Sequence, residues 1–135
     1  MHVLLTRNLE DSKDLIKKLN LSGFKVSNLP LLEISKVNYD YSKLNKFNVI
    51  IFTSSNAIKF LDLKNIDKNN LCFCVGSSTE KIARLNGFQQ VLAADGNVRN
   101  LKELVQQNLP AKDKKILYVS GEVVAYPLDK ELIYE

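Results

Sequence analysis

The chain has few of the side chains on which metal and histidine chemistry depends. His2 is the only histidine among the 135 residues, so a metal site built from several histidines and a Ser–His–Asp arrangement are both excluded. The only cysteines are Cys72 and Cys74, and their spacing is neither a redox Cys-x-x-Cys nor a zinc pattern. They alternate on a predicted strand, so we expect two buried free thiols in a reducing compartment and no bound metal.

Long apolar runs, phosphate-binding loops and clustered positive charge are also missing. No apolar run reaches the roughly 18 residues of a membrane-spanning helix, and neither a Walker loop nor Gly-x-Gly-x-x-Gly is present. The net charge is +4, but the lysines are scattered rather than gathered with aromatic residues on one face. We therefore expect no membrane span and no nucleic-acid partner. Because Met1 leads directly into a predicted strand, we also expect no signal peptide.

What the sequence does contain is a regular alternation of strands and helices. The run Val49–Phe52 is typical of a strand buried on both faces. Further strands are predicted at 2–6 (also buried), 24–26, 71–75, 91–93 and 115–119, and helices at 11–21, 57–63, 80–86, 101–109 and 123–134. Pro30 makes the stretch after the second strand an extended linker or an edge segment, and a loop or short helix is predicted for 36–46. The alternation predicts an α/β protein with a flavodoxin-like, doubly wound parallel sheet.

Small polar residues follow the later strands and precede the helices. The four turns are Thr53-Ser54-Ser55-Asn56, Gly76-Ser77-Ser78-Thr79, Asp95-Gly96-Asn97 and Ser120-Gly121. Because the carboxyl ends of parallel strands meet at one edge of a sheet, these turns should line one rim, where helix N-termini attract anions. Helix capping alone also explains each turn. Acid–base chemistry would fall to Asp95, Glu122 or a tyrosine, none with a distinctive neighbour, so no catalytic residue is assigned.

Six segments taken in order resemble the uroporphyrinogen-III synthase family. They are residues 3–7, 29–34, 51–57, 75–79, 93–96 and 117–122, and Pro-Leu-Leu-Glu-Ile and Phe-Thr-Ser-Ser-Asn-Ala carry most of the likeness. The resemblance implies a cytoplasmic, monomeric lyase of haem biosynthesis that uses no cofactor or metal. It would convert hydroxymethylbilane to uroporphyrinogen III with loss of water and inversion of the D ring. It also implies two α/β domains joined by a two-stranded linker, with the substrate in the cleft.

The same resemblance assigns substrate-binding residues and a domain division. Carried over by motif, the contacts are Arg7, Thr53, Ser54, Ser55, Asn56, Gly76, Ser77 and Thr79. Family members are longer, so we expect this chain to be an amino-terminal part that is inactive alone. Residues 1–34 would be the first βαβ piece of an incomplete domain with the linker, and 35–135 a complete domain. The apolar surface of the first piece should make the chain self-associate.

A non-catalytic binding module is the competing interpretation. A flavodoxin-like small-ligand domain or a receiver domain could share these turns. A receiver needs a cluster of acidic residues at the strand ends, whereas Thr53, Gly76 and Ser120 stand there. A flavin-binding module would be yellow when purified.

Overall fold

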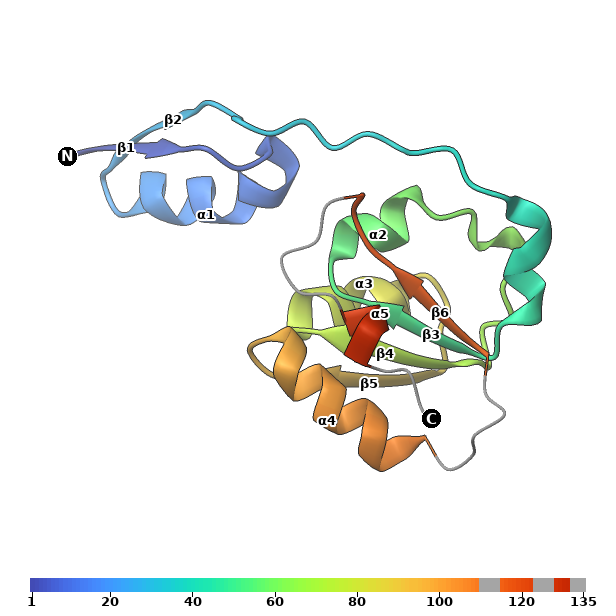
Figure 1. Cartoon of the computed structure of the whole chain (residues 1–135). Helices are drawn as coiled ribbons and strands as arrows, with labels where there is room; N and C mark the ends of the chain where they lie inside the picture. Colours follow the sequence, from blue (N-terminus) through green and yellow to red (C-terminus); the bar gives the residue numbers. More distant parts are fainter. Residues whose placement is uncertain (110–114, 123–127, 132–135) are drawn as a thin grey trace. The chain divides into compact units, whose positions relative to one another are not determined.

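The computed structural model describes residues 1–109, 115–122 and 128–131. The chain separates into two compact units, Met1–Ser35 and Lys36–Glu135 (Figure 1). Each unit contains its own parallel sheet, of two strands in the first and four in the second.

The first unit is a single strand–helix–strand motif. Strands β1 (His2–Leu5) and β2 (Lys25–Asn28) pair in parallel, and helix α1 (Leu9–Leu21) connects them. The side chain of Asn8 caps this helix by accepting the Glu10 N–H at 3.1 Å. The cap explains why the helix begins two residues before its predicted start.

The prediction that the first strand is buried is wrong. Leu4 of β1 is 58% exposed, and Val3 and Leu5 are only half-buried. One helix can cover only one face of a two-stranded sheet, so the other face keeps its contact with solvent. Leu15 and Leu21 of α1 are exposed as well. The first unit therefore presents several large aliphatic side chains at its surface.

An extended segment leads from the first unit to the second. Leu29 and Leu31 donate their backbone N–H groups to the carbonyls of Leu5 and Thr6, at 2.8 and 3.1 Å. The segment thus begins by running alongside the end of β1, and it forms no regular helix or strand before the 3₁₀ helix η1 (Tyr41–Lys46). This short helix confirms one of the two predicted forms of that stretch.

The second unit is built on a four-stranded parallel sheet in the order β5-β4-β3-β6. The strands are β3 (Val49–Phe52), β4 (Leu71–Val75), β5 (Gln90–Ala94) and β6 (Ile116–Val119). Phe52 lies opposite both Cys74 and Val119. The carboxyl ends of β4, β3 and β6 are therefore nearly level, and the turns that follow these strands share one rim.

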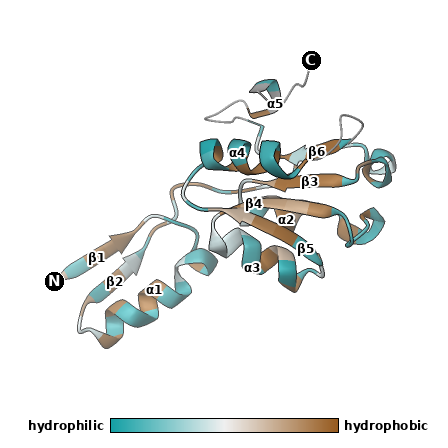
Figure 2. Ribbon diagram, turned by 90° about the horizontal axis from the view of Figure 1, so that it is seen from below, coloured by the Kyte–Doolittle hydropathy of each residue, from teal (hydrophilic) through white to brown (hydrophobic). Residues whose placement is uncertain are grey.

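Helices cover both faces of this sheet (Figures 1 and 2). One face carries α2 (Ser55–Phe60), the 3₁₀ helix η2 (Leu63–Asn65) and α3 (Ser77–Leu85). The other face carries α4 (Val98–Asn108) and α5 (Leu128–Glu131). This arrangement confirms the predicted doubly wound α/β fold.

The two faces of β3 enter two separate apolar clusters. Ile50 and Phe52 pack with Ile58 of α2 in one cluster, and Val49 and Ile51 pack in the other with helices α4 and α5. All four strand residues are at most 1% exposed, as a strand buried on both faces requires. Figure 2 shows the central strands as a band of apolar residues between the helix layers.

The predicted helices differ from the observed ones mainly at their first turns. Helices α2, α3 and α4 begin at Ser55, Ser77 and Val98, two or three residues before their predicted starts. In α2 and α3 the polar residues of the turn join the helix, whereas α4 begins directly after its cap, Asn97. Helix α2 also ends early, at Phe60. Of the helix predicted for 123–134, only residues 128–131 lie within the described part of the chain.

Candidate functional site

The candidate site is the rim formed by the turns at the carboxyl ends of the four parallel strands. In open α/β sheets, ligands bind at this edge, next to the point where the strand order changes direction. Here the change lies between β3 and β6, because β4 and β5 continue to one side of β3 and β6 lies on the other. The four predicted polar turns therefore do meet at one edge of one sheet.

The turn after β3 is capped by its own side chain. Ser54 Oγ accepts the backbone N–H of Asn56 at 3.2 Å, and the Ser54 carbonyl accepts the N–H of Ala57 at 3.1 Å. Ser54 is exposed, whereas Thr53, Ser55 and Asn56 are partly buried. A hydroxyl that accepts a hydrogen bond still has its own proton to donate. Ser54 can therefore cap α2 and donate to a ligand at the same time.

The turn after β4 has no such cap. Gly76 precedes α3 with φ +77° and ψ 152°, a conformation that favours glycine. It has no side chain to accept a hydrogen bond, and helix α3 has no side-chain cap. Ser77 and Ser78 follow it and are exposed. Their backbone N–H groups therefore have no side-chain partner among the described residues, and free N–H groups at a helix N-terminus favour anions.

Thr79, another predicted contact, is buried. Its side chain is 5% exposed, so it belongs to the face of α3 that packs onto the protein. Ser78, which was not among the predicted site residues, presents an exposed backbone position in the same turn. The sequence contained a signal for Ser78, because a glycine before three hydroxyl residues leaves the first turn of the helix without a side-chain cap.

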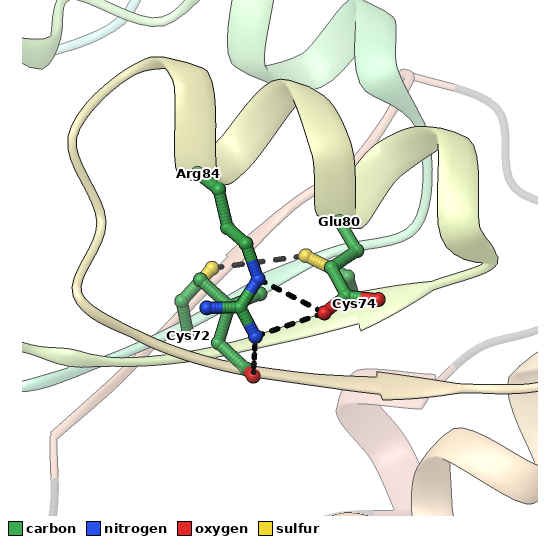
Figure 3. Close-up of polar contacts among 5 residues, drawn as sticks. Cys72, Cys74, Glu80 and Arg84 are labelled. Carbon is green, nitrogen blue, oxygen red and sulfur yellow. Dashed lines mark hydrogen bonds and ion pairs between the residues drawn. The ribbon is translucent and has the colours of Figure 1, made fainter.

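Helix α3 is held on the sheet by Arg84 (Figure 3). Its guanidinium donates to Glu80 Oε1 from Nε at 3.0 Å and from Nη2 at 2.8 Å, and Nη2 also donates to the carbonyl of Val91 in β5 at 2.9 Å. The ion pair neutralises Glu80, which lies in the first turn of α3. The partial positive charge at the N-terminus of α3 is therefore not offset by an unpaired carboxylate in the same helix.

The outer two turns complete the rim. Asn97 caps α4 by accepting the N–H groups of Arg99 and Asn100 at 2.9 and 3.2 Å. At the other end, Ser120 Oγ donates to the carbonyl of Gly121 at 3.1 Å. The two central turns contain no charged side chain. They can hold carboxylates through neutral N–H and O–H donors without a strong positive charge.

Arg7, the remaining predicted contact, belongs to the first unit. It follows β1 and is exposed, and its carbonyl accepts a hydrogen bond from Asn28 Nδ2 at 2.9 Å. The structure thus brings together Thr53, Ser54, Ser55, Asn56, Gly76, Ser77 and Thr79 on one rim, and it places Arg7 in the other unit.

The described residues contain no group of three or more His, Cys, Asp or Glu side chains that could hold a metal ion. Cys72 and Cys74 are buried free thiols, as predicted. In the same part of the chain, no helix combines the length and apolar character needed to cross a membrane.

A family model matches most of the chain. The family described as uroporphyrinogen-III synthase HemD matches residues 13–133. The matched range includes every predicted rim residue and excludes Arg7. The comparison with curated proteins found no match.

Proposed function

The chain belongs to the uroporphyrinogen-III synthase family, and we propose that it binds hydroxymethylbilane and takes part in its closure to uroporphyrinogen III. As a synthase-like enzyme of this family, it has its place in tetrapyrrole biosynthesis. In the proposed reaction, the linear tetrapyrrole loses water, and the D ring is inverted while the ring closes. The two buried free thiols support a reducing, cytoplasmic location.

The observation that carries the proposal is the uncapped start of helix α3. Hydroxymethylbilane carries many carboxylates, and a carboxylate fits the backbone N–H groups of Ser77 and Ser78. The Ser54 hydroxyl in the neighbouring turn supplies a further donor. Because β3 and β4 are adjacent strands, both turns can hold acidic side chains of a single ligand.

The chemistry then rests mainly on positioning. Closure with inversion requires the D ring to be held near the correct carbon. Holding reacting groups in the right geometry can lower the activation barrier by roughly 7–11 kcal/mol in the best cases. The ionisable side chains on the described rim, Asp95 and Glu122, are both exposed carboxylates. We therefore expect this rim to bind and orient the substrate mainly through its neutral N–H and O–H donors.

Binding is tested by removing one backbone donor. Ser77→Pro deletes the N–H at the first helical position, where proline is tolerated. Ser77→Ala is the matched control, because it deletes the hydroxyl and keeps the N–H. With uroporphyrin III as a stable probe in a fluorescence titration, we expect Ser77→Pro to bind roughly three- to tenfold more weakly and Ser77→Ala to bind nearly as before. Equal binding by all three proteins would contradict the assignment of the α3 turn.

Activity is tested separately by product analysis. Hydroxymethylbilane is generated in the presence of the chain, and the type III product is separated from the type I isomer that forms spontaneously. We expect binding without clear enrichment of type III, since no catalytic residue is assigned on the described rim. Clear enrichment would show that the chain by itself completes the reaction, and it would overturn this expectation.

A further inference from the structure

The extended segment between the two units, residues 29–37, carries many exposed aliphatic side chains. They are Leu29, Leu31, Leu32, Ile34 and Val37. The backbone N–H and C=O groups of residues 32–37 have no hydrogen bond to any other described residue. An extended stretch with unpaired backbone groups and exposed apolar side chains is a surface on which another strand can pair.

The contacts of this segment with the first unit leave one of its edges open. Leu31 donates its N–H to the carbonyl of Thr6 at 3.1 Å. In an extended chain, alternate residues direct their backbone groups to opposite edges, so the N–H groups of Leu32 and Ile34 belong to the other edge. Pro30 lies on that open edge as well. Because proline has no N–H to donate, pairing along the open edge ends there.

A second copy of the same segment fits the open edge in one register. A two-fold symmetric antiparallel pair places one residue opposite its own copy. With Glu33 or Lys36 at this centre, like charges would lie directly opposite each other. With Leu32 or Ser35 at the centre, the carboxylate of Glu33 would lie opposite an aliphatic side chain. These four registers are therefore disfavoured.

The register with Ile34 at the centre brings compatible side chains together. Ile34 then lies opposite its own copy, and Leu31 lies opposite Val37, so exposed aliphatic residues cover one another. Glu33 lies opposite Ser35, whose hydroxyl can donate to the carboxylate.

We propose that two copies of the chain pair through residues 31–37 as an antiparallel two-stranded ribbon centred on Ile34. The ribbon uses the open edge and leaves the bond from Leu31 to the first unit in place. Lys36 lies opposite Leu32 in it, where the aliphatic stem of the lysine covers the leucine while the ammonium stays in water. Because each contact occurs twice, the assembly closes as a dimer and adds no further copies.

Cysteine cross-linking of the full chain tests the register. The two native cysteines are buried, so they should not react. In the ribbon, two copies of Ile34→Cys face each other at a Cα separation of about 5 Å, within the range of a disulfide. Leu32→Cys is the control, because Leu32 is the more exposed residue but its two copies would lie roughly 13 Å apart along the strands.

With oxidised glutathione as the oxidant, we expect Ile34→Cys to form a linked dimer at least about tenfold faster than Leu32→Cys. Equal rates for the two variants would show chance collision or another contact surface, and they would overturn the proposed ribbon.

A second measurement tests the backbone pairing. Ile34→Pro removes the N–H at the centre of the ribbon from both copies, whereas Ser35→Pro removes an N–H that faces the other edge. In sedimentation experiments, we expect at least about tenfold weaker dimerisation for Ile34→Pro, because two hydrogen bonds are lost, and nearly unchanged dimerisation for Ser35→Pro. If both variants associate as the unsubstituted chain does, the exposed aliphatic residues of the first unit cause the association and the proposal is wrong. Equal weakening by both variants, or a chain that is monomeric at high concentration, would contradict it as well.

Discussion

The Sγ atoms of Cys72 and Cys74 lie 3.8 Å apart in the buried interior of the second unit. Both residues are 0% exposed, and both are free thiols. The hydrogen bond with Cys74 and then burial raise the pKa of Cys72, because both favour the neutral thiol. The pair therefore belongs to the core and not to a reactive or metal-binding site.

The thiols should be unreactive while the chain is folded. At about pH 8, we expect no reaction with a thiol reagent such as DTNB before denaturant is added and reaction of both cysteines afterwards. The raised pKa of Cys72 also predicts that the free energy of unfolding falls as pH rises above the ordinary thiol value of 9.0. The Cys72→Ala/Cys74→Ala variant should lack this part of the pH dependence. Fast labelling of the folded chain would contradict the prediction.

Gly76 should be required for stability because of its backbone conformation. A Cβ added there would meet nothing within 4 Å, but φ is +77°. The cost of Gly76→Ala is therefore backbone strain alone, which we expect to lower the free energy of unfolding by about 1–3 kcal/mol. Ser78→Ala, two residues away, should change it by less than about 0.5 kcal/mol. Urea unfolding of both variants measures the difference. An unchanged urea midpoint for Gly76→Ala would contradict the predicted backbone strain.

Asp40 should titrate well below an ordinary aspartate. Its Oδ1 accepts the Ser42 hydroxyl at 2.6 Å, its Oδ2 lies 3.1 Å from Lys43 Nζ, and together these contacts lower its pKa to about 2. The stabilisation is present above the ordinary value of 3.8 and is lost as pH falls toward 2. In an NMR titration, Ser42→Ala should raise this pKa more than Lys43→Gln, because the Ser42 bond is the larger cause. The reverse order would contradict this assignment.

The exposed aliphatic residues of the first unit should promote self-association. Leu4 and Leu21 are 58% and 81% exposed. Burying one such side chain in an interface stabilises the associated state by roughly 1.5–3 kcal/mol. We expect light scattering to show concentration-dependent association of the chain, reduced by Leu4→Lys with Leu21→Lys. Leu85→Lys is the control, because Leu85 is 72% exposed but lies in the second unit. A strictly monomeric chain at high concentration would rule out this surface as an interface.

Much of the second unit could be predicted because its signals are local. The apolar run at Val49–Phe52 and the polar residues after it required only side-chain pattern and turn chemistry, and both appear where expected. The helix starts were less predictable. Ser55 and Ser77 are polar and resemble loop residues in the sequence, yet they form the first turns of α2 and α3.

The sequence alone thus determined the α/β class, the buried central strand and the common rim, because strand period and turn composition are properties of neighbouring residues. Tertiary structure decided that Thr79 is buried and that Asp95 lies beside Gly76. These facts depend on which strands are adjacent, and adjacency is set by packing over the whole sheet rather than by any local stretch.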